Sequence, residues 1–493
     1  MSESNQSAYR NVFKATTLFG GVQAYNILIS LVRAKFVAIF LGPAGMGILN
    51  LLQMPLGLIQ QLTGLGISYS AIRDISQASA SGDEEKIGRT LSVFRKWVWW
   101  TGLAGVAVTM ALSPLLSRWT FGNGDYTYSF LLLSSTLLFT ALSSGYGAAL
   151  QGLRKLRYLA RASVIGATVG LLVSIPLYYY FRIKGIVPTI IIASITTLIL
   201  NWFYSRKITI KKITVTWKEV WYEGNSMAKL GLLITISGLI LTFVSYLINI
   251  YISRTGGIDQ VGLYQAGFSI TDKYVGMIFA AMATDYYPRL AGIVDDRKKM
   301  IETVNQQAEI SLLILGPVLL MLLTTLPLVI RILYTPQFLK IMEFVPWIIL
   351  GMPVKAASWS MGFIILAQGK SRMYFFSELF ASALLLIFCI LGYRFLGMQG
   401  LGLAFLFMYL LYFIYLLAVC TSRFSFSFLR TFYGLLAVTM ILCGISVFLF
   451  YYISFPTVYY FGSIISILSL TYSIYKIHEK VNLKNIILNL FKK

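Results

Sequence analysis

The sequence predicts an all-α polytopic membrane protein with about fourteen transmembrane helices, and three observations support this fold class. Charged residues make up only 12% of the 493 residues and hydrophobic residues 57%, whereas soluble domains carry roughly 25% charged residues. The hydrophobic residues gather into runs of roughly 20, the length that a helix needs to cross a hydrocarbon core of about 30 Å. Basic residues alternate between the connections, being frequent in every second one.

Short connections separate the apolar runs, and backbone groups in lipid must bond internally, so each run is expected to be a helix. In order, the runs fall near 17–40, 47–72, 97–117, 127–150, 162–181, 186–204, 228–252, 262–286, 308–330, 344–367, 375–393, 398–420, 431–453 and 457–475.

The basic residues orient these spans. With the N-terminus placed in the cytoplasm, the cytoplasmic segments hold 29 of the 41 Lys and Arg residues, and the opposite side holds 7. Such an excess is typical of the cytoplasmic side, so both termini are predicted to be cytoplasmic. The same rule accounts for the net charge of +23, and no nucleic-acid partner is expected.

Several classes of site are not expected. The polar N-terminus runs through one apolar segment straight into a second, which argues against a cleavable signal peptide. The cysteines Cys389, Cys420 and Cys443 lie in apolar helices without disulfide or metal-binding spacing, and His478 is the single histidine. We therefore expect neither a metal site nor a cofactor.

An internal repeat divides the spans. Gly42-Pro-Ala-Gly-Met-Gly47 follows span 1, and Gly257-Ile-Asp-Gln-Val-Gly262 follows span 7, at an offset of 215 residues. Gln151-Gly to Tyr158 after span 4 matches Gln368-Gly to Tyr374 after span 10, and Gly185 matches Gly400. Six spans per copy make the copies parallel, so two six-helix lobes are expected around a central cavity. The predicted parts are an N-lobe (1–207), a C-lobe (208–422), spans 13 and 14 (423–476) and a cytoplasmic amphipathic tail (477–493).

Polar residues form stripes on the first two spans. Helical spacing places Gln23, Asn26, Ser30 and Arg33 on one face of span 1, and Asn50, Gln53, Gly57, Gln60, Gly64 and Ser68 on one face of span 2. Polar side chains avoid lipid, so they face protein or water. Interhelical packing suits the Gly and Ser positions. A water-filled cavity suits the amides, and the predicted polar or charge partners are Gln23, Asn26, Gln53, Gln60, Asn249 and Asp272.

Some basic residues lie inside the spans and not in the connections. The deepest of them are Arg33, Lys273 and Lys355. A charge at mid-bilayer costs about 2.5–3.5 kcal/mol, which implies a partner or a function. Asp272 is the only acid at comparable depth and could pair with one of the three. The expected result is a cationic cavity for an anionic substrate, with pyrophosphate preferred because Arg and Lys bind its oxygens. Lys35 and Lys229 are expected to extend to the interface.

With its six, six and two spans and its two repeated motifs, the chain resembles the polysaccharide-lipid flippases of the multidrug/oligosaccharidyl-lipid/polysaccharide exporter superfamily, particularly O-antigen and lipid III translocases. The resemblance implies lobes that alternate access and flip an undecaprenyl-pyrophosphate oligosaccharide (an O-antigen, common-antigen or capsule unit) to the periplasmic leaflet of a bacterial inner membrane. It implies pyrophosphate binding at Arg33, Lys273 and Lys355, no enzymatic activity, and a monomer that has membrane lipid, a glycan polymerase or other assembly proteins as partners. The extra pair of spans is more similar to the lipid II flippases, whose added helices form a groove for the lipid tail.

Three alternatives remain open. The first is a lipid II-type flippase of peptidoglycan precursors. The second is a drug/cation antiporter of the same superfamily, although spans 1 to 6 lack the mid-membrane Asp or Glu needed for ion coupling. The third is an integral-membrane polymerase or ligase, which the short extracytoplasmic loops and the repeat disfavour.

Overall fold

The computed structural model describes residues 3–208, 213–453 and 457–481, and in these ranges every regular element is helical. The all-α prediction is confirmed. Contacts divide the chain into two compact units, Met1–Gly262 and Leu263–Lys493, so that the division falls inside one helix.

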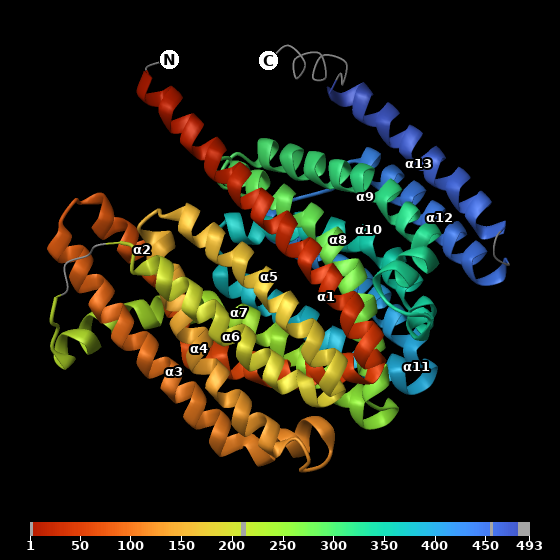
Figure 1. Ribbon diagram of the computed structural model, residues 1–493. Coiled ribbons are helices and arrows are strands. Elements are labelled where there is room, and N and C mark those ends of the chain that lie inside the picture. The colour runs from red at the N-terminus through yellow and green to blue at the C-terminus, as the bar shows by residue number, and fades with distance from the viewer. Residues whose placement is uncertain (1–2, 209–212, 454–456, 482–493) are drawn as a thin grey trace. The chain divides into compact units, whose positions relative to one another are not determined.

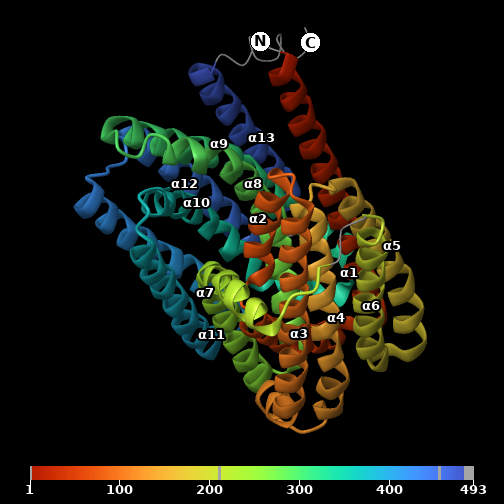
Figure 2. The ribbon, with the colours of Figure 1, turned by 90° about the vertical axis from the view of Figure 1, so that its left-hand side faces the viewer.

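The first unit is built around packed pairs of long helices (Figure 1). Its elements are α1 (Glu3–Gly64), α2 (Ile67–Ala80), α3 (Glu84–Phe121), α4 (Thr127–Gly152), α5 (Leu156–Phe181), the 3-10 turn η1 (Arg182–Gly185), α6 (Ile186–Ser205), α7 (Trp217–Gly256) and the start of α8 (Ile258–Ala291). The helix α4 packs against α3 and α6, and α5 packs against α6 and α1. Figure 2 shows α3 and α4 running side by side. The helix α7 packs against α1, α2 and α3, which places the predicted first span of the C-lobe in this unit.

The second unit contains the remainder of α8 and the C-terminal helices. Its further elements are α9 (Arg297–Leu333), the 3-10 turn η2 (Pro336–Glu343), α10 (Val345–Ala367), α11 (Ser371–Phe424), α12 (Arg430–Tyr452) and α13 (Thr457–Val481). The helix α10 packs against α11, and α9 packs against α10, α12 and α13. Figure 1 shows α12 and α13 beside α9.

The number of crossings is compatible with the fourteen that the sequence predicts. Ten segments among the described residues are long and apolar enough to span a membrane. Three of them, Gly20–Gly64, Leu156–Ser205 and Ser371–Phe424, contain 45, 50 and 54 residues, which suffices for two crossings each because about 20 helical residues span 30 Å. They are interrupted at Gly42, at η1 and at Gly397. The helix α8 adds a further 34 residues.

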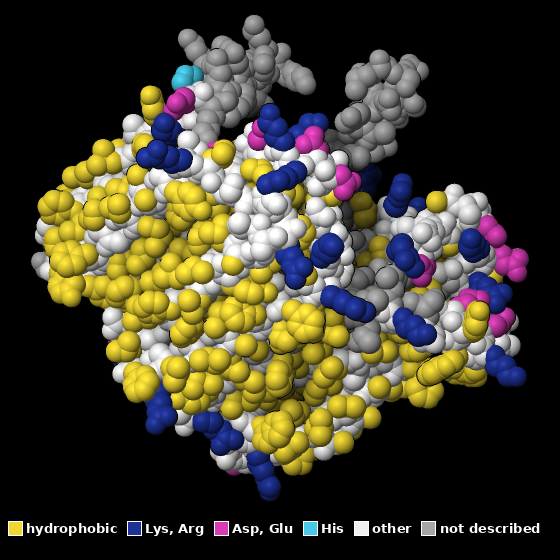
Figure 3. All heavy atoms as spheres, turned by 180° about the vertical axis from the view of Figure 1, so that it is seen from behind, with side chains coloured by type: hydrophobic (Ala, Val, Ile, Leu, Met, Phe, Trp, Pro, Cys, Tyr) yellow, Lys and Arg dark blue, Asp and Glu magenta, His cyan; other side chains and the backbone are white. Residues whose placement is uncertain are grey.

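The exposed surface agrees with a protein that spans a membrane. Large hydrophobic side chains are exposed along almost every long helix, from Leu28 in α1 to Ile474 in α13. Hydrophobic side chains cover much of the face in Figure 3. Exposed apolar surface on this scale is stable only in lipid.

The backbone repeats with the same 215-residue offset as the sequence motifs. Three pairs of residues have a positive φ at equivalent positions, a conformation that L-residues rarely adopt. The pairs are Gly42 and Gly257 (φ 65° and 89°), Arg154 and Gly369 (55° and 67°), and Arg182 and Gly397 (50° and 58°). The last pair reverses the chain between consecutive long helices, so the two copies share their turns as well as their motifs.

The repeated glycine motifs contact each other within the first unit. A Cβ on Gly47 would overlap the carbonyl oxygen of Ile258, and a Cβ on Gly262 would overlap that of Pro43. Residues 43 and 47 are the repeat equivalents of 258 and 262. The contact is therefore reciprocal, and only glycine permits this backbone-to-backbone approach.

The predicted continuous span 47–72 is interrupted. Helix α1 ends at Gly64, α2 begins at Ile67, and Leu65 and Gly66 between them have φ values of 48° and 60°. A Cβ on Gly66 would overlap the carbonyl oxygen of Gly231 in α7. The break thus brings α7 against the α1–α2 junction, and neither glycine belongs to a repeated motif.

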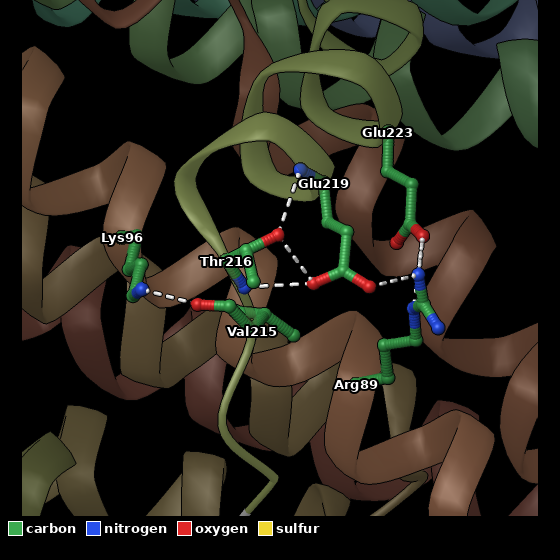
Figure 4. Close-up of polar contacts among 6 residues, drawn as sticks. All are labelled: Arg89, Lys96, Val215, Thr216, Glu219 and Glu223. Atoms are coloured by element: carbon green, nitrogen blue, oxygen red, sulfur yellow. Dashed lines mark hydrogen bonds and ion pairs between the residues drawn. The ribbon is translucent and has the colours of Figure 1, made fainter.

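Polar contacts hold the start of α7 against α3 (Figure 4). Thr216 caps α7 in a capping box with Glu219. Arg89 of α3 donates to Glu219 and Glu223, each over 2.9 Å. Hydrogen bonds from the backbone and side chain of Thr216 lower the pKa of the Glu219 carboxyl, and the charges of Arg89 and Lys96 lower it further. Glu219 is therefore ionised at neutral pH and keeps its ion pair with Arg89.

The reciprocal glycine contact yields a prediction. Gly47→Ala and Gly262→Ala should each lower the thermal transition of the detergent-solubilised protein, because overpacking costs about 1–3 kcal/mol. Gly57→Ala, on the same helix as Gly47 but with nothing within 4 Å of an added Cβ, is the matched control. The transition temperatures are measured by size-exclusion chromatography after heating. Equal transition temperatures for all three variants would contradict the proposed packing constraint.

Candidate functional site

Arg33 lies on α1 in the first unit, and its guanidinium occupies space that a glycine leaves free on α5. A Cβ on Gly170 would lie 2.8 Å from Nη2 of Arg33. The Nε of Arg33 is buried and has no hydrogen-bond partner. The recorded ion pairs of the described residues involve other cations. Arg33 therefore has donor capacity that its surroundings leave unused.

Part of the polar stripe on α1 faces α5. Asn26 donates its Nδ2 to Ser163 over 2.8 Å, and the Tyr25 and Thr168 hydroxyls lie 2.7 Å apart. Asn26 Oδ1 is buried without a partner. Gln23, at the N-terminal end of the stripe, is exposed. The α1–α5 interface therefore uses one amide of the stripe in an interhelical hydrogen bond and places Arg33 two turns further along the helix.

The other predicted amides have different surroundings. Gln53 is exposed and Gln60 half-buried, both on the second half of α1. Asn249 of α7 is fully buried, and its Nδ2 donates to the Ser245 carbonyl over 2.7 Å. Gln53 and Gln60 are accessible to a ligand in this structure, whereas Asn249 has no exposed surface.

Lys355 of α10 lies in the second unit among aromatic rings. Its ammonium is 5.8 Å from the ring centroids of Phe279 and Phe405 and 5.7 Å from that of Tyr409. These distances are near the outer limit of about 6 Å for a cation–π contact. Within the described part of the chain, no ion pair includes Lys355. The half-buried ammonium therefore lies near the faces of three aromatic rings.

The side chains of Asp272 and Lys273 lie outside the described residues, so only their helix is placed, within α8. Two other carboxylates of the second unit are paired with hydroxyl groups. Tyr412 donates to Glu378 over 3.1 Å, and Thr431 donates to the buried Glu309 over 2.5 Å. These acids are stabilised by hydroxyl donors rather than by Lys355.

Two features of the cationic residues were not foreseen from the sequence. Phe405 and Tyr409 are four residues apart on one helix, which indicates a shared face, but nothing in the sequence pairs that face with Lys355. Likewise, Gly170 carries no motif that marks it as the neighbour of Arg33. Both features depend on which helices pack together.

Comparison with known proteins identifies the family. Residues 36–343, more than half of the chain, match the family model described as polysaccharide biosynthesis protein. The chain belongs to this family. The match begins three residues after Arg33 and spans the two glycine motifs.

The relatives and the solved structures agree with this assignment. Proteins named Lipid III flippase from Escherichia coli (strain K12) and Shigella flexneri are 22% identical over 392 residues, which cover 78% of this chain and 92% of theirs. The structure resembles the lipid II flippase MurJ in an inward closed conformation (TM-score 0.68, 15% identity, 94% of this chain and 99% of that one). It also resembles an inward-facing multidrug resistance MATE family transporter of the MOP superfamily (TM-score 0.69, 14% identity, 81% and 94%). The predicted transporter fold is confirmed.

The surroundings of Lys355 yield a second prediction. Lys355→Met should leave the thermal transition unchanged or raise it, because the change removes a half-buried charge and keeps a long apolar chain among the rings. Lys340→Met, at an exposed position in η2, is the control for loss of one charge. A fall of several degrees for Lys355→Met alone would show that the lysine supports the fold.

Proposed function

We propose that this chain is a flippase that moves an undecaprenyl-pyrophosphate-linked oligosaccharide from the cytoplasmic to the periplasmic leaflet by alternating access. The observation that carries the proposal is the similarity to proteins named Lipid III flippase over 78% of the chain, together with membership of the polysaccharide biosynthesis family. The glycan would be an O-antigen, common-antigen or capsule repeat unit.

The proposed binding residues are Arg33, Lys273 and Lys355, which would neutralise the pyrophosphate. The unpartnered Nε of Arg33 and the position of the half-buried Lys355 ammonium near three aromatic rings support this role. A guanidinium binds phosphate oxygens through a planar fork, and an ammonium acts as a point charge with three donors. Gln23, Gln53 and Gln60 would contribute hydrogen bonds to the sugar units, Asn26 and Asn249 would fix the helices that carry the cations, and Asp272 would be the charge partner of a cation.

A bacterial inner-membrane location with cytoplasmic termini belongs to the same proposal. The distribution of 29 against 7 basic residues supports the orientation. The protein would act as a monomer, beside a glycan polymerase or another assembly protein that uses the flipped substrate.

A lipid II-type flippase is the second candidate. The likeness to MurJ covers 94% of this chain, compared with 81% for the MATE family transporter. The two candidates differ in the strain that they rescue. Expression in a strain lacking its lipid III or O-antigen flippase should restore the surface glycan, while a MurJ-depleted strain should still lyse; the reverse result would favour lipid II.

The proposed cations yield a third prediction. Arg33→Gln, Lys273→Gln and Lys355→Gln should each lower glycan export in the rescued strain at least about tenfold, because a hydrogen bond to a charged group contributes about 1.5–3 kcal/mol. Surface glycan and protein level in the membrane are measured together.

Lys229→Gln is the matched control, because Lys229 lies in a span but its side chain is exposed. It should export normally. Full export by all three test variants at normal protein levels would contradict a role of these cations in substrate binding.

A further inference from the structure

An open groove lies where α3 and the start of α7 meet in the first unit. It has a volume of about 330 Å³, within the range of about 300–1,000 Å³ that is typical of small-ligand sites. Figure 2 shows the first turns of α7 against α3. The residues that line it are Thr63, Leu65, Trp97, Trp100, Thr101, Ala104, Trp217, Val220 and Trp221.

Four of the nine lining residues are tryptophans. Trp97 and Trp221 stack with ring centroids 5.4 Å apart, and Trp100 and Trp217 meet edge to face at 5.9 Å. Trp100, Trp217 and Trp221 are 58%, 58% and 69% exposed. Such exposure of large rings in a built groove leaves apolar surface that a ligand could cover.

Three polar groups of the wall form hydrogen bonds inside the protein. The indole nitrogen of Trp97 donates to the Val220 carbonyl over 2.8 Å. The hydroxyls of Thr63 and Thr101 donate to the carbonyls one turn earlier, at 2.8 and 3.2 Å. The part of the wall around Thr63, Trp97 and Thr101 therefore presents apolar surface, which suits an alkyl chain.

The side chain of Lys96 lies at one end of the groove. Lys96 Nζ lies 4.7 Å from the Trp217 ring centroid and donates to the Val215 carbonyl over 2.7 Å, which leaves two of its three donors without a partner among the described residues. Arg89 pairs with both nearby acids, Glu219 and Glu223, and Lys96 and the exposed Lys218 bring the cations at this end to three against these two acids. From Lys96 to Ala104, α3 rises about 12 Å at 1.5 Å per residue, from the basic end of the helix toward its apolar part.

We propose that this groove binds an anionic phospholipid, with one acyl chain along Trp100 and Ala104 and the phosphate at Lys96. The chain covers the exposed rings, and the phosphate accepts hydrogen bonds from the two remaining donors of Lys96. The exposed Lys218 follows Trp217 in the first turn of α7. The site is independent of the proposed transport substrate, because it uses none of Arg33, Lys273 or Lys355.

Tryptophan quenching tests the site. The full chain is reconstituted in vesicles that contain brominated phosphatidylglycerol or brominated phosphatidylcholine at equal mole fractions, and bromine quenches a tryptophan only on contact. The wild type should be quenched preferentially by phosphatidylglycerol. Lys96→Gln should lower this preference about fivefold, because one basic residue near the surface contributes about 1 kcal/mol toward an anionic lipid.

Ala104→Phe fills the groove without removing a tryptophan or a charge, and should abolish the preference. Lys207→Gln is the matched control, since Lys207 lies over the rings of Phe203 and Tyr204 outside the groove, and should keep the wild-type preference. Equal quenching of the wild type by both lipids would overturn the proposal. So would a preference that survives Ala104→Phe, because the lipid would then be held at the surface and not in the groove.

Discussion

The reciprocal contact between the two glycine motifs is the constraint from which the rest of the first unit follows. Gly47 meets the Ile258 carbonyl, and Gly262 meets the Pro43 carbonyl, a pattern like that of a twofold interface in which residue i contacts j and j contacts i. Any side chain at either glycine would separate the two backbones. Because Pro43 and Gly47 immediately follow the bend at Gly42, and Ile258 and Gly262 follow the positive-φ Gly257, the same short motif both turns the chain and makes the contact.

Equivalent positions do not need identical residues to share a conformation. Arg154 and Arg182 adopt positive φ values where the second copy has Gly369 and Gly397. An L-residue in this region carries backbone strain of about 1–3 kcal/mol, so packing in the first copy stabilises a turn that glycine forms freely in the second. One compensating contact is visible at Arg182, whose guanidinium donates to the Phe40 carbonyl near the end of the first half of α1, over 3.0 Å.

The sequence predicted the helices well, because apolar length and basic connections are both local signals. The runs 344–367 and 431–453 agree with α10 and α12 within a residue or so. Features made by distant segments could not be predicted in the same way. The interruption at Leu65 and Gly66 depends on the approach of Gly231 from α7, and the rings around Lys355 come from α8 and α11. The candidate cations were recognised by type, since charge in an apolar run is conspicuous, but their neighbours were not.

The cations of this chain differ in how many of their hydrogen-bond donors have partners in the protein. The exposed cation is better paired than the one inside an apolar helix, which is the reverse of what would maximise the stability of the fold. Arg89, at a partly exposed position, is paired with two glutamates, although an exposed pair contributes only about 0–1 kcal/mol. Lys96 uses one donor on a carbonyl. Arg33, inside an apolar helix, retains a buried and unpartnered Nε, although an unpaired charge is most costly there. A fold selected for stability alone would place its acids in the opposite order, and the anionic ligand that we propose would satisfy the unpartnered Nε of Arg33.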